Sequence, residues 1–284
     1  MPTAVRSLAL FWNKKLFREA GLDPEKPPVT NDELVEFAKK LTKRNARGVM
    51  EVEGITVDPS KQDQHWWREV LIRQFGGQPF SNDNKKVTYN NEAGLKATTW
   101  YSDLFMTHKV AELGFLDEGQ AAFRSGRAGM TIDGSFRPPD FNKQKDLEYG
   151  IAELPSHNGI KSNYASYWVN GITSKAKGDK QVAAEKFLVF ITSPEAMKLW
   201  LEYAGELPAR KTAALTPENL ANPMAGPFIR GLEYAHATYF VAETDQRKIN
   251  MDMFDRIRTG TSIADSLKKA AEDEQKLLDK AFAK

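Results

Sequence analysis

The residue types that most often carry catalysis are present in this chain, but their spacing does not form a recognisable catalytic or metal-binding motif. There is no cysteine, the 4 histidines are scattered, and no H-E-x-x-H pair of metal ligands occurs. Ser135 lacks the flanking pattern of a nucleophile elbow, and no glycine-rich phosphate loop is present. The 38 acidic residues offer many pairs for glycoside cleavage, but nothing marks one pair out. We therefore predict no enzyme activity, no metal and no cofactor, and keep a glycoside-processing enzyme as the alternative.

Composition excludes several classes of partner. The 284 residues carry a net charge of +2, from 40 basic and 38 acidic side chains that are interspersed along the chain. A nucleic-acid-binding protein would need a clustered basic face, so no nucleic-acid partner is expected. No apolar run approaches the length of a membrane span.

The stretch from Ala121 to Arg137 could build the wall of a ligand site. Apolar and polar residues alternate up to Asp133, which predicts a half-buried strand that ends in a tight turn. Phe136 and Arg137 follow the turn, and two prolines then prevent a regular continuation. We take Asp133, Phe136 and Arg137 as candidate ligand contacts. The alternative is that Phe136 begins the core of the next element.

Aromatic residues also stand at other predicted loop and strand ends. Aromatic rings stack on the C–H faces of sugars, whereas amides, carboxylates and arginines bind the hydroxyl groups. The alternative for each ring is core packing, which we favour for Trp12 and Tyr239. The set comprises Trp12, Trp66, Phe136, Tyr167, Trp168 and Tyr239.

The order of predicted elements is that of an α/β protein. The clearest helix begins at Asn31, after a capping box of Thr30 and Glu33 and a hydrophobic staple of Val29 and Leu34. Strands are predicted over 5–12, 48–57, 86–89, 128–132, 147–154 and 164–173. Helices are predicted over 16–20, 31–43, 63–75, 91–106, 181–191, 228–240, 249–259 and 263–282, with another from Pro194.

Six motifs, taken in order, resemble bacterial extracellular solute-binding protein family 1, the binding proteins of ABC importers that include maltose-binding protein. They are SLALFWNKKLFREAGLDPEKPPVTNDELVEFAKKLT, IRQFGGQPF, AAFRSGRAGMTIDGSF, YGIAELP, AEKFLVFITSPEAMKLWLEYAGELPARKTA and TGTSIADSLKKAAEDEQKLLD. The resemblance implies a periplasmic-binding-protein type II fold, in which two α/β lobes close on a solute.

The resemblance also implies a division of the chain. Residues 7–155 and 217–284 would form a nearly complete carboxy-terminal lobe, and residues 164–212 the remaining part of the amino-terminal lobe. Residues 1–6, 156–163 and 213–216 would be crossover or hinge segments. Family members carry a further strand-helix-strand region ahead of the segment that resembles residues 1–17, so we expect an incomplete second lobe and impaired solute binding.

The family's ligand contacts can be carried over to matching positions. Phe136 would stack on the solute, Trp66 would add a second ring, and Gln64 a polar contact. Tyr167, Trp168 and Asn170 lie in a segment that reaches the cleft in the family. Arg6 and Arg247 stand at positions that differ from maltose-binding protein, and two cations would suit an acidic sugar or a glycerol phosphate. The alternative is that both arginines pair with carboxylates of the protein.

The resemblance implies an extracytoplasmic binding protein whose partners are a carbohydrate-like solute and the membrane subunits of an ABC importer. A third hypothesis is a fragment that binds no solute and self-associates. It follows from the expected incomplete lobe, because a strand without its neighbours exposes hydrogen-bonding groups and apolar surface.

Overall fold

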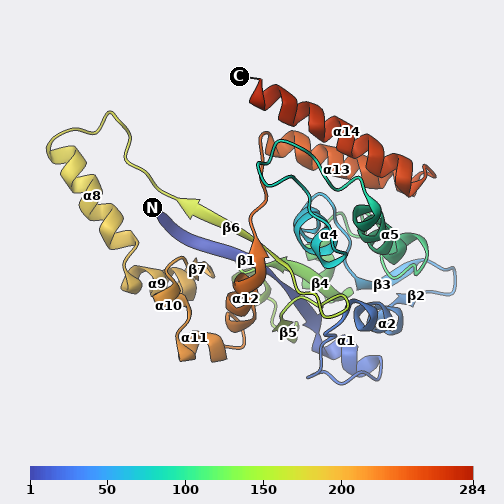
Figure 1. Cartoon of the computed structure of the whole chain (residues 1–284). Helices are drawn as coiled ribbons and strands as arrows, with labels where there is room; N and C mark the ends of the chain where they lie inside the picture. The colour runs from blue at the N-terminus through green and yellow to red at the C-terminus, as the bar shows by residue number, and fades with distance from the viewer. Residues whose placement is uncertain (284) are drawn as a thin grey trace.

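One long strand, β1 (Pro2–Asn13), runs through the whole molecule in the computed structural model, which describes residues 1–283 (Figure 1). Its second half pairs with β4 (Ala128–Gly134) and β5 (Tyr149–Ala152). Its first half pairs with β6 (Asn163–Val169) and β7 (Leu207–Pro208). β1 is therefore the strand that connects the two parts of the structure.

The sheet is buried on both faces around β4. The strand order is β2-β3-β4-β1-β6-β8, where β2 is Lys43–Arg44, β3 is Met50–Ile55 and β8 is Ala235–His236. All seven residues of β4 are buried, so the predicted half-buried strand is wrong. Alternate residues of β1 explain why: Leu8 and Leu10 enter one core cluster, and Ala9 and Phe11 enter another on the opposite face.

Helices of the main body cover this sheet (Figure 1). The capping box of α2 is confirmed by bonds between Thr30 and Glu33, but the predicted staple is wrong because Val29 is 64% exposed. The helices are α1 (Lys14–Glu19), α2 (Asn31–Leu41), α3 (Asp63–His65), α4 (Ile72–Gln74), α5 (Glu92–Met106), α6 (Gly119–Arg124), α7 (Pro138–Phe141), α12 (Gly226–Gly231), α13 (Glu243–Arg258) and α14 (Ile263–Phe282).

Two further predictions need correction. The helix expected over 228–240 is shorter than predicted. It corresponds to α12, which ends at Gly231, and one 3-10 turn, Leu232–Tyr234, separates it from β8. The strand expected over 86–89 is a single bridge between Phe80 and Val87. The helix expected over 63–75 is present, but its middle is a π-helix, Trp66–Leu71.

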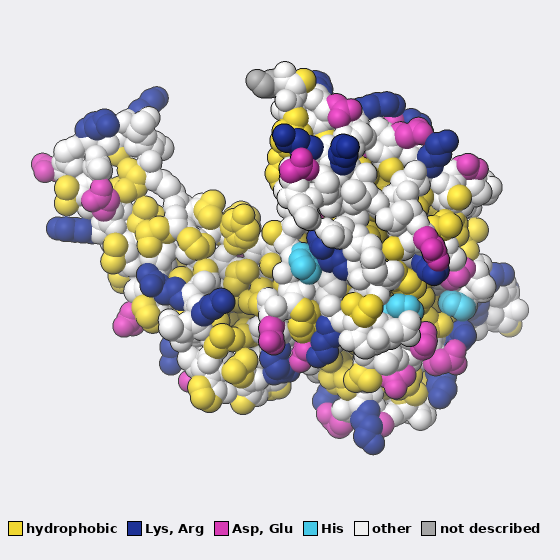
Figure 2. Space-filling model, in the orientation of Figure 1, with side chains coloured by type: hydrophobic (Ala, Val, Ile, Leu, Met, Phe, Trp, Pro, Cys, Tyr) yellow, Lys and Arg dark blue, Asp and Glu magenta, His cyan; other side chains and the backbone are white. Residues whose placement is uncertain are grey.

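A slender arm extends from the main body on the side where β1 begins (Figure 1). We use this name for the end of β6 together with α8 (Asp179–Ile191) and α9 (Pro194–Ala204); α10 (Lys211–Ala214) and α11 (Pro217–Ala221) follow at its base. None of the residues of α8 is buried, and Phe187 and Phe190 are 60% and 63% exposed. Figure 2 shows hydrophobic side chains gathered over this arm, which a notch separates from the main body. Among residues 1–283, no helix has the length and apolar character needed to cross a membrane.

A buried ion pair fixes the π-helix to the carboxy-terminal helices. Arg68 on the π-helix lies 2.9 Å from Glu274 on α14, and both side chains are at most 1% exposed. Glu274 also accepts hydrogen bonds from Tyr89 (2.8 Å) and Gln246 (2.7 Å). Since the residues just before the π-helix line the candidate site, this network sets the position of one wall of that site.

We predict that Glu274→Leu lowers the free energy of unfolding by about 3–5 kcal/mol, because it leaves the Arg68 charge buried without a partner. The double variant Arg68→Met, Glu274→Leu should lose less, since it removes both charges. Asp273→Asn, which removes a partly exposed pair with Lys269 on the same helix, is the control and should change stability by less than about 1 kcal/mol. Urea denaturation measures all three, and a double variant no more stable than Glu274→Leu would contradict the assignment.

Candidate ligand-binding cleft

A cleft of about 380 Å³ opens where the arm meets the main body. It lies between β1, the turn that follows β4, β6, the α3 segment and the segment that leads into α13. Its lining consists of Arg6, Ser7, Leu8, Gln62, His65, Gly134, Phe136, Tyr164, Ala165, Ser166, Tyr167, Trp168, Ala237, Thr238, Phe240, Glu243 and Arg247. Five of the predicted contact residues are brought together here: Arg6, Phe136, Tyr167, Trp168 and Arg247.

Two aromatic rings from different elements meet at the guanidinium group of Arg6. Its central carbon lies 4.5 Å from the centroid of Phe136 and 4.9 Å from that of Trp168. Such contacts are attractive because the face of an aromatic ring is negative. The Phe136 ring also packs on Gly134, where an added Cβ would lie 2.2 Å from a ring carbon. A glycine is thus required at position 134 to seat this ring.

Arg6 is held by the carboxylate of Glu206, which lies between α9 and β7. Its Nε donates to both oxygens of Glu206 at 2.9 Å, and its Nη2 forms a further short bond to Glu206. The alternative considered from the sequence, an internal ion pair, therefore describes Arg6. The Nη1 group takes no part in this pair, and it remains a donor for a hydroxyl or an anionic oxygen. The sequence did not single out Glu206, because its contact with Arg6 joins residues 200 positions apart in the chain.

The opposite wall of the cleft contains a second arginine, Arg247, which polar groups of the protein hold in place. Arg247 donates to Glu243 and to the carbonyl oxygen of Ser60, both at 2.8 Å. The amide oxygen of Gln64, in the orientation that satisfies its neighbours, accepts from both terminal nitrogens of Arg247 at 2.8 Å. Arg247 is therefore also internally paired, and the buried Gln64 orients it rather than lining the cleft.

His65 is a lining residue that the sequence did not single out. Its ring stacks on Tyr164, with centroids 3.8 Å apart and planes 4° apart. Burial, and then the nearby charges of Arg68 and Arg247, lower the pKa of His65 to about 3. His65 is consequently neutral at physiological pH and adds no charge to the lining of the cleft.

The structure does not bring Trp66 and Asn170 into the cleft. Trp66 is 1% exposed and makes edge contacts with Trp100 and Tyr101 of α5. The π-helix and the cover of α5 place every residue of Trp66–Leu71 in the interior. Asn170 donates from its amide to Thr3 (3.1 Å) and so ties β6 to the start of β1.

Asp133 and Arg137 stabilise the turn behind Phe136 instead of lining the cleft. Arg137 Nε donates to Asp133 Oδ2 at 2.5 Å, and the other carboxylate oxygen accepts from the Gly134 amide at 2.7 Å. Burial raises the pKa of Asp133, an effect that Arg137 opposes. The two residues act on the site by holding the backbone on which Phe136 stands.

The sequence of residues 1–226 matches the family described as bacterial extracellular solute-binding protein. The chain belongs to this family. Its members are binding proteins of ABC transporters and not enzymes. Over 218 residues the chain is 26% identical to the sn-glycerol-3-phosphate-binding periplasmic protein UgpB of Escherichia coli K12. This match covers 72% of the chain and 47% of the relative, so the chain spans about half the length of that protein.

Solved structures show the same α/β fold. UgpB from Mycobacterium tuberculosis, in complex with glycerophosphocholine, superposes with a TM-score of 0.82 at 18% identity, over 98% of this chain and 70% of that one. A binding protein from Thermotoga lettingae, bound to α-D-tagatose, gives a TM-score of 0.80 at 22% identity, over 98% and 72%. Maltose-bound MalE3 from T. maritima gives 0.77 at 24%, over 98% and 72%. The fold of periplasmic binding proteins, expected from the sequence motifs, is confirmed.

We predict that His65 makes folding sensitive to acid. Its folded pKa lies below the value near 6.5 of an unfolded histidine, so the stability it contributes is present above pH 6.5 and is lost as the pH falls toward 3. Between pH 6.5 and 5 the free energy of unfolding should fall by about 2 kcal/mol, because a difference of one bound proton changes it by about 1.4 kcal/mol per pH unit. Urea denaturation from pH 7.5 to 5 should therefore show a shallower decline for His65→Gln than for the unsubstituted chain, and parallel curves would contradict the buried neutral state.

Proposed function

We propose that this chain is the solute-binding component of an ABC importer and takes a carbohydrate or carbohydrate-like solute, acidic solutes included, in the cleft. Like the periplasmic relative UgpB, it would work outside the cytoplasm, and it would deliver the solute to the membrane subunits of the importer. The relatives named above bind sugars or glycerol phosphates, and they support this class of solute.

The proposal rests on one observation: the rings of Phe136 and Trp168 both contact the guanidinium group of Arg6. The two rings come from the main body and from the arm, so a solute placed against them would contact both parts of the molecule. A ligand that contacts both parts favours the closed arrangement by its differential contacts. Family binding proteins would use such a hinge motion about the crossover strands, to which β1 and β6 correspond.

The positive and negative charges of the cleft are balanced, and this limits how strongly the cleft would prefer an acidic solute over a neutral one. Arg6 pairs with Glu206 and Arg247 with Glu243, so each cation has a carboxylate beside it. Arg247 uses its terminal nitrogens on Glu243, Gln64 and Ser60, whereas Arg6 keeps Nη1. We assign Arg6 as the residue that meets a phosphate or carboxylate group, and Arg247 as a residue that positions the wall.

The arm side of the cleft is open, and this predicts weak binding. Tyr167 and Trp168 are 60% and 53% exposed, and the neighbouring Val169 is 63% exposed. A solute resting on these side chains loses less water-exposed area than one enclosed on all sides. The expected impairment of binding thus follows from the exposure of the lining itself.

Self-association is a second candidate, which the unpaired edge of β6 favours. Within residues 1–283, β6 pairs with β1 along its length but with β8 only at Asn163 and Tyr164. A second copy of the chain offers an identical free edge, and two such edges can pair antiparallel about a twofold axis. The apolar residues of α8 lie in the same arm and would add buried area.

Calorimetry with sn-glycerol-3-phosphate tests the binding proposal. We expect saturable binding with a dissociation constant weaker than micromolar, and a further weakening of roughly tenfold in Trp168→Ala because a stacked ring contributes about 1 kcal/mol or more. Trp200→Ala is the matched control, since Trp200 is also exposed but lines no part of the cleft. Arg6→Gln should reduce the preference for sn-glycerol-3-phosphate over glycerol.

Three results would count against the account. Absence of binding to sn-glycerol-3-phosphate, maltose and tagatose would contradict the proposed function and favour the second candidate. Micromolar or tighter binding would contradict the open cleft. Equal losses in Trp168→Ala and Trp200→Ala would remove Trp168 from the site.

Light scattering tests the second candidate. We expect the apparent mass to rise with concentration toward that of a dimer, and Phe190→Glu to shift this rise to higher concentration because it places a charge on the apolar face of α8. Lys180→Glu, on an exposed polar position of the same helix, is the control. A strict monomer at every concentration would exclude self-association through the arm.

A further inference from the structure

A hollow of about 410 Å³ lies on the side of the main body away from the arm, where α1 and β2 are found (Figure 1). Its walls come from α1, the β2–β3 ribbon, the turn that follows α6 and the loop between α7 and β5. It shares no lining residue with the cleft. A ligand bound here would therefore not depend on the hinge or on the arm.

Positive charge is concentrated in the lining of this hollow, which we call the basic hollow. Four cations and two carboxylates line it, so its formal excess of two positive charges equals the net charge of the whole chain. A concave surface with an excess of one sign of charge raises the local concentration of small ions of the opposite sign. The charged lining residues are Lys15, Lys43, Arg124, Lys145, Glu19 and Asp146.

Two lysines share one carboxylate at the α1 wall. Lys43 Nζ donates to Glu19 Oε2 at 2.6 Å. This hydrogen bond, together with the charges of Lys43 and Lys15, lowers the pKa of Glu19, an effect that burial opposes only in part. Both ammonium groups therefore act on the same carboxylate, which can neutralise only one of them. Within residues 1–283, no ion pair joins Lys15 to a carboxylate.

The other walls add donors that the protein itself does not use. Arg124 Nη1 donates to Asp140 at 3.2 Å, and the Arg124 side chain is 44% exposed, so its other nitrogens can reach a ligand. Lys145 is exposed and takes no part in an ion pair within the described chain. The backbone amides of Lys145 and Asp146 likewise donate to no acceptor among residues 1–283. These groups are donors available to anionic oxygens.

The excess charge and its distribution indicate the class of ligand. The cations come from four separate elements, and two of them, Lys15 and Lys145, are unpaired. A monoanion would balance only half of the excess charge. A diphosphate carries at least two negative charges on oxygens that point in several directions, so it can accept from cations of more than one wall. A neutral sugar would gain little, because the lining offers no exposed aromatic ring.

We propose that the basic hollow is a second ligand site, which takes a small polyanion of the diphosphate type. Lys15 and Lys145 contact the anion directly, Arg124 and Lys43 add to the attraction, and Glu19 weakens binding because it neutralises part of the positive charge. The site is independent of the proposed function, since a chain that binds no solute in the cleft could still bind an anion here.

Calorimetry with inorganic pyrophosphate at low ionic strength tests the site in the full chain. We expect saturable binding with a dissociation constant below about 1 mM, which weakens as salt is raised to about 0.15 M because the exposed charges are then screened. The double variant Lys15→Gln, Lys145→Gln should bind roughly 5- to 20-fold more weakly, since it removes both unpaired cations. Glu19→Gln should bind roughly 2- to 5-fold more tightly, because it frees Lys43.

Two controls separate this site from general charge effects and from the cleft. The double variant Lys268→Gln, Lys280→Gln removes the same charge from exposed positions of α14, and Arg6→Gln removes a cation from the cleft. Both should bind pyrophosphate as the unsubstituted chain does. The proposal is overturned if the unsubstituted chain shows no saturable binding, or if the two double lysine variants lose affinity equally. It is also overturned if Glu19→Gln weakens binding, or if Arg6→Gln abolishes it.

Discussion

β1 pairs with two sets of strands, and these pairings determine where every other part of the chain lies. Its twelve residues join β4 and β5 of the main body to β6 and β7 without a break. Every residue of β1 beyond Arg6 is buried, and alternate side chains enter the two core clusters. Burial on both faces holds this part of β1 firmly within the main body, whereas Val5 and Arg6 are only partly buried.

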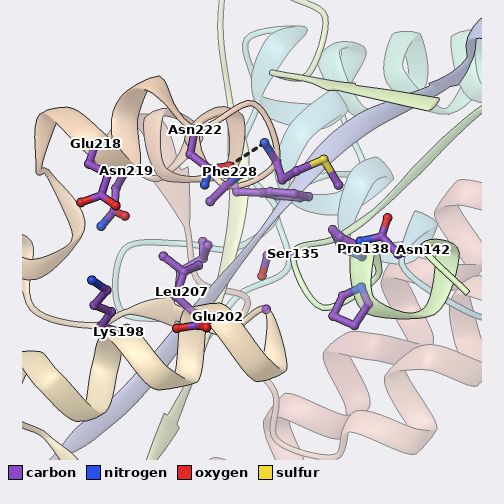
Figure 3. Close-up of a pocket in the computed structure, with 15 residues that line it drawn as sticks. Ser135, Pro138, Asn142, Lys198, Glu202, Leu207, Glu218, Asn219, Asn222 and Phe228 are labelled. Carbon is purple, nitrogen blue, oxygen red and sulfur yellow. Dashed lines mark hydrogen bonds between the residues drawn. The ribbon is translucent and has the colours of Figure 1, made fainter. Parts of the chain in front are cut away.

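Strand register then determines which side chains meet in the cleft. Trp168 pairs with Ala4, and Gly134 pairs with Leu8, on either side of Arg6. The amide of Ser135 donates to the carbonyl oxygen of Ser7 at 3.1 Å, which continues the pairing into the turn. A shift of one residue in either pairing would turn Arg6 or Trp168 to the other face of the sheet. Ser135, the residue between Gly134 and Phe136, lines a separate hollow of about 370 Å³ (Figure 3).

The sequence predicted those features that depend on local pattern or on the order of motifs. The strand before Asp133, the capped helix at Asn31 and the family fold follow from such signals. Trp66 could not be placed, because the π-helix depends on packing against α5 and on the buried Arg68–Glu274 pair, whose members lie far apart in the chain. Glu206 and Tyr164 were missed for a related reason: their contacts with Arg6 and His65 join distant segments that no local spacing connects.

The central claim is that one solute contacts the main body and the arm at the same time. NMR titration of the chain with sn-glycerol-3-phosphate tests this directly, with the ring signals of Phe136 and the indole N–H of Trp168 assigned by substitution. Both signals should shift along one binding curve while the indole signal of Trp200 stays in place. Movement of only one of the two signals, or separate curves for Phe136 and Trp168, would contradict a shared site.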